Sequence, residues 1–345
     1  RLAPRKLVTL GAAQGLTNNY VRSVAETGDG RLWLGTTGGG LYCEEGGTLR
    51  LFTNAPFNTF YPFVETVLTA RDGSLWWGGA ASLFHWKNGR LAEAYTRGSN
   101  ALVEASIIPE WLATAAVTAL REDVVGGMWV GTSQGIVVRL AEGSERVLTN
   151  RLARGSVTSF AQEPDGTLWV GSLAGGLSRL RGDTATTFSA EDGLASSHVR
   201  VLHRTGDGVL WIGTGGGGLV RYQAGQFKSI SSREGLGDDT VSQILEDEQG
   251  CLWLGCNRGI FRVRKSDLDD LAAGRKTFLH PQAFGLNAGM LAEECTGGSS
   301  PAACKRKSGK LAFATVKGVV LIDPHLQVFD SSAPTVLLEE VWADR

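Results

Sequence analysis

The feature that most constrains the fold is a tryptophan that recurs six times in a fixed local context. A glycine stands two residues after each tryptophan, a leucine or methionine one residue before it, and a valine twelve residues before it. The six tryptophans are Trp33, Trp76, Trp129, Trp169, Trp211 and Trp253. They are separated by 43, 53, 40, 42 and 42 residues, so the chain is built from an internal repeat of about 42 residues.

Each repeat predicts four short β-strands. An apolar run such as "VRSVAET" is followed by an Asp-Gly turn, by "LWLG", by a glycine cluster and by two further strands. Units of this length and strand content are typical of β-propeller blades. A seventh, degraded copy, "GKLAFATVKGVV", has Ala312 in the tryptophan column and Ala314 in the glycine column. The sequence therefore predicts an all-β fold over residues 1–324, a seven-bladed β-propeller of four-stranded antiparallel blades.

We expect the two ends of the chain to close the ring. The last blade takes its inner three strands from about 299 to 322, so its outer strand has to come from "RKLVTL" at 5–10. The tryptophans are expected to pack where one blade meets the next, and the glycines to lie where a side chain would crowd that packing. An insertion, "SDLDDLAAG", predicts a short helix with Ser266 as its N-cap and Gly274 beyond its end.

Composition excludes several classes of partner. The 34 basic and 35 acidic residues give a net charge of −1, which lacks the basic surface that nucleic-acid binding requires. No stretch is long and apolar enough to span a bilayer, so this fragment is not expected to insert into a membrane. Because the chain begins with Arg1 rather than Met, we expect it to be a piece of a longer protein or a mature product.

The cysteines and histidines show no spacing typical of a metal site. Neither Cys-x-x-Cys nor His-Glu-x-x-His occurs, so no metal and no other cofactor is expected. Cys251 and Cys256 fall on opposite faces of one predicted strand and are not expected to pair. Cys295 and Cys304 flank a loop and are a candidate disulfide, with the alternative that both are free.

Two motifs that look catalytic are better explained as turns, and no catalytic residue is assigned. "GTSQG" at 131–135 matches the hydrolase elbow Gly-x-Ser-x-Gly, but sister repeats carry "GTTGG" and "GTGGG" at the same place, which makes Ser133 a turn residue. "GTGGGG" at 213–218 is followed neither by a helix nor by the Lys-Ser/Thr pair of a phosphate loop.

Polar and aromatic residues recur where the chain enters each inner strand. In a propeller these positions converge on the mouth of the central channel, where they suit a hydroxyl-rich ligand. The candidate ligand-binding residues are Asn18, Asn19, Tyr20, Tyr61, Thr114, Ser156, His198, Asp239 and Ser299. The alternative is that they are ordinary loop residues, which are usually polar. Asp239 and its neighbour Asp238 lack the alternating oxygen ligands of a calcium loop.

The repeat pattern, "GL…V..V…DG.LW.GT..GGL.R(Y/F)", resembles the two-component regulator propeller repeat. The stretch "ECTGGSSPAACKRKSGKLAFATVKGVVLIDP", followed by "APTVLLEEV", is similar to that family's last blade and the start of its three-tyrosine, immunoglobulin-like domain. By this resemblance, residues 325–345 are a linker and the first strand of a truncated β-sandwich domain. The resemblance also implies the periplasmic sensor part of a bacterial histidine kinase held in the inner membrane.

The function implied by the resemblance is sensing without catalysis. A small-molecule or oligosaccharide ligand binds at the central face, and a homodimer of the full-length receptor relays the signal to kinase domains outside this fragment. Two alternatives stay open because a fold does not decide function. One is a propeller enzyme acting on glycans as a lyase or hydrolase, for which His198 and Asp239 are candidates without a second matched acid. The other is a protein-interaction scaffold.

Overall fold

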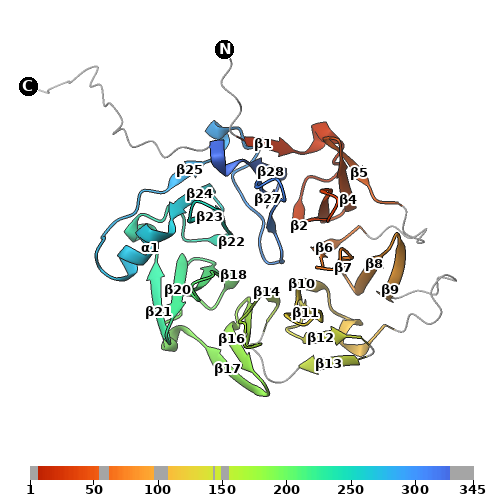
Figure 1. Cartoon of the computed structure of the whole chain (residues 1–345), viewed down its shortest axis with the longest axis horizontal. Coiled ribbons are helices and arrows are strands. Elements are labelled where there is room, and N and C mark those ends of the chain that lie inside the picture. Colours follow the sequence, from red (N-terminus) through yellow and green to blue (C-terminus); the bar gives the residue numbers. More distant parts are fainter. Residues whose placement is uncertain (1–6, 54–61, 97–107, 143, 149–154, 327–345) are drawn as a thin grey trace, which may run out of the picture.

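The computed structural model is a closed ring of seven four-stranded antiparallel sheets, which confirms the predicted propeller (Figure 1). The structure describes residues 7–53, 62–96, 108–142, 144–148 and 155–326. Tyr61 and most of the predicted segment 325–345 therefore lie outside the described residues. Among the helices of these ranges, none has the length and apolar character that crossing a membrane requires.

Six blades use four consecutive strands each, and the last blade takes one strand from the N-terminus. Blades 1 to 3 consist of β2 (Val21–Glu26), β3 (Leu32–Thr36), β4 (Gly40–Glu45), β5 (Thr48–Leu51), β6 (Val64–Thr69), β7 (Leu75–Gly79), β8 (Ser82–Lys87), β9 (Arg90–Thr96), β10 (Val117–Glu122), β11 (Met128–Thr132), β12 (Val137–Ala141) and β13 (Ser144–Leu148). Blades 4 to 6 consist of β14 (Val157–Gln162), β15 (Leu168–Ser172), β16 (Gly176–Arg181), β17 (Thr184–Phe188), β18 (Val199–Arg204), β19 (Leu210–Thr214), β20 (Leu219–Gln223), β21 (Gln226–Ile230), β22 (Val241–Glu246), β23 (Cys251–Cys256), β24 (Gly259–Arg264) and β25 (Gln282–Phe284). Blade 7 consists of β26 (Ala303–Lys305), β27 (Leu311–Thr315), β28 (Gly318–Ile322) and β1 (Leu7–Leu10).

The N-terminal strand closes the ring as predicted. β1 runs antiparallel to β28, with Leu7 opposite Ile322 and Leu10 opposite Val319. Leu7 and Leu10 are both buried, and they belong to the clusters on opposite faces of blade 7. β1 therefore covers the outer edge of β28 and also contributes to the packing on both sides of the last blade.

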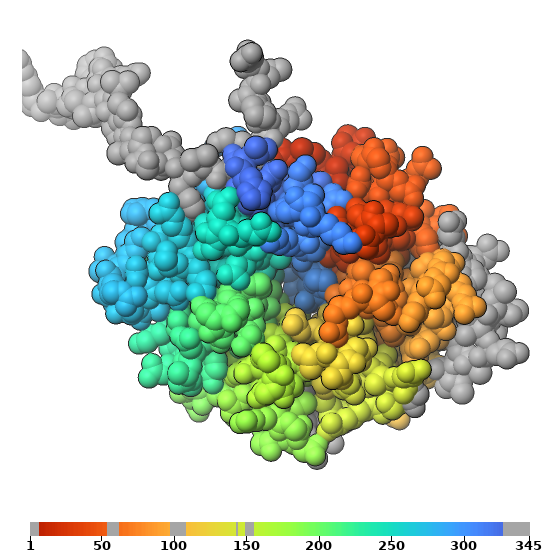
Figure 2. All heavy atoms as spheres, in the orientation of Figure 1, coloured from red at the N-terminus to blue at the C-terminus, as the bar shows by residue number. Residues whose placement is uncertain are grey.

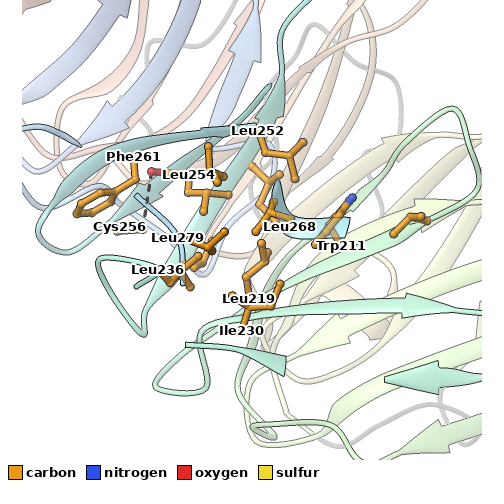
Figure 3. Packing of buried hydrophobic residues seen from close by; sticks show 14 residues of the cluster. Trp211, Leu219, Ile230, Leu236, Leu252, Leu254, Cys256, Phe261, Leu268 and Leu279 are labelled. Atoms are coloured by element: carbon orange, nitrogen blue, oxygen red, sulfur yellow. Dashed lines mark hydrogen bonds between the residues drawn. The ribbon is translucent and has the colours of Figure 1, made fainter. Parts of the chain in front are cut away.

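Seven buried apolar clusters hold the ring together, one between each pair of neighbouring blades. Each repeated tryptophan lies in the cluster between its own blade and the next, which confirms its predicted place as a wedge. Figure 3 shows one such interface, where Trp211 of blade 5 packs with Leu252 and Leu254 of blade 6. At the seventh interface Ala312 and Ala314 are fully buried against blade 1.

The repeated glycine and the repeated valine meet across these interfaces. A Cβ atom added to Gly131 would lie 2.4 Å from Cγ1 of Val157, and one added to Gly171 would lie 2.5 Å from Cγ1 of Val199. Real Cβ atoms essentially never approach so closely. The glycine of one repeat and the valine of the next, which are 26 and 28 residues apart in these two pairs, therefore form one contact between blades.

The short helix forms, but its predicted N-cap is wrong. Helix α1 spans Lys265–Ala272 and begins directly after β24, with Arg264 in the N-cap position. Ser266 lies inside the first turn because the backbone N–H of Lys265 is already bonded to the carbonyl of Gly250 at 3.0 Å. Gly274 follows the helix with φ of 73°, the left-handed conformation expected at that place. Short 3₁₀ helices span Ala12–Gln14, Glu110–Leu112, Ala190–Asp192, Ser232–Glu234, Leu286–Ala288 and Pro324–Leu326.

The candidate disulfide between Cys295 and Cys304 is also wrong, because all five cysteines are free. Cys295 packs with Trp253 and Phe313 in the cluster between blades 6 and 7. Cys304 packs against the cluster between blades 7 and 1. The sheet of the last blade therefore separates the two thiols. Cys251 and Cys256, which were not expected to pair, are buried and unpaired.

Candidate ligand-binding site

A cavity of about 510 Å³ lies around the axis of the ring, at the end where the inner strands begin. Blades 1 to 5 contribute to its wall, together with the connection between blades 6 and 7. Figure 2 shows the corresponding arrangement of blades around a central depression. The polar side chains that line the cavity are those of Tyr20, Arg22, Glu65, Thr118, Ser133, Ser156, Arg200 and Glu294.

A β-bulge at the start of each of the first six inner strands positions part of this lining. The pairing register of β18 with β19 shifts between Val199 and Val201, which leaves Arg200 as the extra residue. The same shift occurs in β2, β6, β10, β14 and β22. The bulged residues are Arg22, Glu65, Thr118, Thr158, Arg200 and Ser242. Since a bulge redirects a side chain, this shared irregularity explains why four of the six reach the cavity.

Three lining residues of blades 1 and 2 form one polar group. Arg22 Nε lies 2.7 Å from Glu65 Oε2, so the two side chains form an ion pair between neighbouring blades. The guanidinium carbon of Arg22 lies 5.9 Å from the centroid of the Tyr20 ring. Ser299 Oγ donates to the same Glu65 oxygen at 3.4 Å. These contacts leave an aromatic ring, which is about one-third exposed, beside a fixed acceptor and donor.

Arg200 lies in the cavity wall without a carboxylate partner. Its one side-chain hydrogen bond goes from a terminal nitrogen to Ser242 Oγ at 3.4 Å, and its buried Nε has no partner. No Asp or Glu of the described ranges approaches it within 4.0 Å. A Cβ atom on either Gly215 or Gly297 would lie 3.1 Å from the guanidinium, so glycines make room for it on two sides. Arg200 thus presents to the cavity a guanidinium without a direct carboxylate partner, and Glu294 contributes a carboxylate to the same wall.

The connection between blades 6 and 7 crosses the channel beneath the cavity, and we call its residues 296–302 the channel plug. The carbonyl of Pro301 accepts from the backbone N–H of Val24 at 3.2 Å, and that of Ser300 accepts from Leu120 at 3.0 Å. On the other side of the ring, Gln243 Nε2 donates to the carbonyl of Thr296 at 2.7 Å. In Figure 1 the chain of the last blade, in blue, reaches the ring axis. The cavity is therefore a pocket with a floor, because the plug pairs with inner strands on several sides.

The structure places part of the predicted ligand set in this wall. Tyr20 and Ser156 line the cavity directly. Ser299 is buried in the channel plug and reaches the cavity only through Glu65. Asn18 accepts the backbone N–H of Tyr20 at 3.0 Å and so holds the loop that carries this ring.

The other predicted residues lie around the mouth, outside the cavity lining. Thr114 and His198 are exposed at the rim. Asp239 is occupied, because its carboxylate accepts from the backbone N–H and the hydroxyl of Ser232 at 2.6 and 2.8 Å. Asn19 is half-buried, and its side-chain oxygen has no hydrogen-bond partner. Whether these residues contact a ligand stays a prediction.

Sequence reasoning missed Arg22, Glu65 and Arg200, although a signal for them exists. Each follows the repeated valine directly, and that column is polar in all six copies. The sequence analysis instead favours the column directly before the valine, because that column lies in a loop and loops usually carry binding sites. Strand alternation alone does not predict that the column after the valine reaches the channel, since a bulge breaks the alternation.

Two lining residues that could act as nucleophiles, Ser133 and Cys295, make structural contacts. Ser133 lies in the turn between β11 and β12 and accepts the backbone N–H of Ala116 at 3.0 Å, as expected of a turn residue. Burial raises the pKa of the Cys295 thiol to about 12, so this thiol stays protonated at neutral pH. The described part of the chain holds no cluster of three His, Cys, Asp or Glu suited to a metal ion. What the lining offers is recognition by hydrogen bonds, an aromatic face and a positive charge.

The fold and this pocket define a class of protein: a closed seven-bladed β-propeller whose plugged channel ends in a polar cavity. Residues 15–38, 193–216 and 235–258 match the family model of the two component regulator propeller. No curated protein is significantly similar to the chain in sequence.

Solved structures share the fold across several functions. The extracellular domain of BT3049 from B. thetaiotaomicron, described as a hybrid two component system, is 24% identical with a TM-score of 0.74, over 93% of this chain and 41% of that chain. Virginiamycin B lyase from Staphylococcus aureus is 14% identical with a TM-score of 0.66, over 92% and 99%. PorZ, a surface component of the type-IX secretion system of Porphyromonas gingivalis, is 15% identical with a TM-score of 0.63, over 90% and 47%. These likenesses show the fold alone.

The opposite end of the channel carries a buried histidine that makes stability depend on pH. Burial, and the nearby Arg121, lower the pKa of His203 from 6.5 to about 4. Because the folded pKa lies below the unfolded one, the stabilisation is complete above about pH 6.5 and is lost as the pH falls toward 4. Urea unfolding at pH 7.5 and pH 4.5 is expected to show that the wild type loses about 2 kcal/mol more than His203→Gln. Equal losses in both proteins would contradict this assignment.

Proposed function

We propose that the chain is the extracytoplasmic sensor module of a bacterial two-component receptor, and that it binds an acidic, glycan-like ligand in the central cavity without altering it chemically. The observation that carries this proposal is Arg200, which faces the cavity with no carboxylate partner in the described structure. A carboxylate or sulfate group on the ligand would complete this pair. Tyr20 offers a face for stacking a sugar ring, while Glu65 and Ser156 offer hydrogen bonds to hydroxyls.

The match of three repeats to the two component regulator propeller supports the sensor part of this proposal. The chain spans about two-fifths of the length of the BT3049 extracellular domain, 41%, so membrane anchoring, pairing of two receptor copies and kinase activity belong to the proposed longer protein. In that protein the module faces the periplasm, and ligand binding changes the geometry of a homodimer.

A glycan lyase is the second candidate, favoured by the likeness of the whole fold to virginiamycin B lyase. Against it, Glu65 is held by Arg22, and neither His198 nor Asp239 lines the cavity. An acid–base mechanism requires two such groups within reach of the same substrate. A protein-interaction scaffold is the third possibility and is separated from the others by the experiment below.

Acidic oligosaccharides, such as fragments of polygalacturonate and chondroitin sulfate, are expected to raise the melting temperature, whereas their neutral counterparts raise it less. Arg200→Ala is expected to weaken binding at least about tenfold, because a charge-assisted hydrogen bond is lost. Calorimetric titration measures the affinity, and Arg233→Ala, an exposed arginine outside the lining, is the control.

Three results would contradict the sensor proposal in different ways. New reducing or unsaturated ends in the sugar mixture would indicate the enzyme. The same affinity in Arg200→Ala and wild type would remove the central cavity as the binding site. The absence of any stabilising glycan, together with a protein partner that protects the central face, would indicate the scaffold.

A further inference from the structure

The residue opposite each repeated tryptophan on the third strand of the blade forms a further column of the repeat. In four blades the residue opposite the tryptophan on the neighbouring strand is an arginine. The pairs are Trp129 with Arg139, Trp169 with Arg179, Trp211 with Arg221, and Trp253 with Arg262. In three of them the guanidinium carbon lies 5.2 to 6.0 Å from the indole centroid. In three it also pairs with a carboxylate, at 2.6 to 3.2 Å. Both contacts occur together in blades 5 and 6, where the guanidinium of Arg221 or Arg262 lies between an indole ring and an acid.

Blade 2 has lost this guanidinium. His85 takes the arginine's place opposite Trp76, and the two rings stack with centroids 3.9 Å apart and planes 14° from parallel. The position six residues before the tryptophan has changed as well. In three other blades it supplies the acceptor for the indole N–H, as Thr27, Glu163 and Asp247 do for Trp33, Trp169 and Trp253. In blades 3 and 5 the indole N–H is buried without a partner.

In blade 2 that acceptor position holds Ala70, which has no side-chain acceptor. Trp76 is only 7% exposed, and its indole N–H has no hydrogen-bond partner among the described residues. Both ring nitrogens of His85 are likewise buried without a partner. Blade 2 therefore keeps the aromatic wedge but leaves the ring nitrogens of His85 without hydrogen bonds, which is costly in a buried position unless something else binds there.

A cavity of about 790 Å³ occupies this place, and we call it the blade 2–3 cleft. Its walls include Trp76, His85 and Tyr95 of blade 2 and Met128 and Leu140 of blade 3. The lining comes from the ends of the inner and third strands, from the starts of the second and outer strands, and from the turns that join them. The cleft therefore opens at the end of the ring opposite the central cavity, whose lining comes from the starts of the inner strands.

The cleft is lined by five carboxylates and one lysine. The carboxylates belong to Asp72, Glu93, Glu122, Glu142 and Glu145. Asp72 is paired with Lys87 at 2.8 Å, and Glu122 with Arg71 at 3.1 Å. The other three have no lysine or arginine of the described residues within 4.0 Å. Glu145 accepts the indole N–H of Trp111 at 2.7 Å, and Glu93 accepts the Tyr95 hydroxyl at 3.1 Å. Glu93 Oε1 also lies 3.9 Å from Nδ1 of His85.

We propose that the blade 2–3 cleft binds a guanidinium or primary ammonium group supplied from outside the chain. The external cation would take the role that Arg221 and Arg262 have in blades 5 and 6, among fixed carboxylates and beside an aromatic wall. The volume exceeds what one such group fills, and the apolar walls suit the aliphatic chain that carries it. This site is separate from the central cavity and does not depend on the proposed function.

Such a cation has two sources, a small amine or a basic side chain of a polypeptide. The probes are therefore N-acetyl-arginine amide and a longer peptide with one central arginine, titrated calorimetrically at low ionic strength. Their citrulline counterparts keep the shape and remove the charge. Arginine probes are expected to bind at least tenfold more tightly than citrulline probes. If both arginine probes bind, a small cation is sufficient to occupy the cleft. If only the peptide binds, the cleft recognises a basic side chain of a polypeptide partner.

Variants of the cleft test the location. Glu93→Gln combined with Glu142→Gln is expected to weaken the arginine probe at least tenfold. His85→Arg restores the arginine that blades 3 to 6 carry at this position. Its guanidinium is expected to occupy the cation site of the cleft, which raises the melting temperature and weakens binding of the arginine probe at least tenfold. His85→Gln is the control, because it adds no positive charge to the cleft. Arg200→Ala in the central cavity is expected to leave the affinity for the arginine probe unchanged.

The proposal is overturned if citrulline probes bind as well as arginine probes, or if neither binds. It is also overturned if Glu93→Gln combined with Glu142→Gln leaves the affinity for the arginine probe unchanged. This test does not depend on whether His85→Arg folds. Loss of arginine binding in Arg200→Ala would move the site to the central cavity. If neither the wild type nor any variant binds a glycan, only the proposed function is contradicted, because binding in the cleft is measured with arginine probes.

Discussion

Deletion of residues 1–10 is expected to lower the free energy of unfolding by about 5 kcal/mol or more, because the deletion removes β1 from the last blade. Leu7 and Leu10 are 3% and 6% exposed, and they pack into the clusters on opposite faces of that blade. Removing a buried leucine side chain typically costs about 2 to 5 kcal/mol. The deletion also exposes the edge of β28, which is free to pair with another chain. Urea unfolding followed by tryptophan fluorescence measures the loss, and size-exclusion chromatography detects association.

Point variants separate the packing from the loss of the strand. Leu7→Ala with Leu10→Ala is expected to reproduce most of the destabilisation while keeping the backbone pairing with β28. Val8→Ser is the matched control, because Val8 lies on the same strand and is 49% exposed, so its effect is expected to stay below about 1 kcal/mol. A truncated protein as stable as the wild type would mean that the ring closes without β1.

The fold could be predicted from sequence because its repeated columns are physical partners. A glycine of one blade meets a valine of the next blade at five of the seven interfaces, so the same contact appears five times in the sequence as a pair of repeated columns. The tryptophan adds a third column, since the same wedge is required each time. Where the copy is degraded, at Ala312, the ring still closes because β27 and β28 keep their apolar character.

The site could be predicted only in part, because its residues follow local backbone irregularity. Tyr20 and Ser156 were found as loop positions at the channel mouth. Arg22, Glu65 and Arg200 depend on bulges, whose direction strand alternation does not predict. The floor of the cavity depends on the channel plug, which pairs with strands more than 170 residues away, Leu120 among them. No pattern within one repeat carries that information.

The blade 2–3 cleft was missed for a different reason. The sequence shows that His85 and Ala70 depart from their columns, but a departure from a repeat is usually neutral. Only the side-chain contacts show that the two departures remove the partners of one buried tryptophan and leave a cavity between carboxylates. Comparing the blades of one propeller with each other thus indicates where a binding site has replaced an internal contact.

Gly171→Ala is expected to destabilise the protein by about 2 kcal/mol, through overpacking rather than backbone strain. The added Cβ would lie 2.5 Å from Cγ1 of Val199 in the next blade, and Gly171 does not have the positive φ that would itself penalise alanine. Val199→Ala alone is expected to cost about 2 kcal/mol, since it leaves a cavity at the same interface. The double variant is expected to lose at least about 1 kcal/mol less than the sum of the two, because the new methyl group occupies the space left by the valine.

The sign of this coupling distinguishes two roles for the repeated glycine. If glycine is required only to make β15 flexible, the two substitutions act independently and their effects add. If it is required to admit the neighbouring valine, the effects are less than additive, and the same cycle on Gly131 and Val157 behaves alike, because the corresponding distance there is 2.4 Å. Gly206→Ala is the control for glycine loss as such, since a Cβ at that turn meets no atom within 4 Å and the residue lacks a positive φ. Additive effects at both interfaces would mean that the glycine is not required to make room for the neighbouring valine. The tryptophan would then be the one repeated residue with a shown packing role between blades.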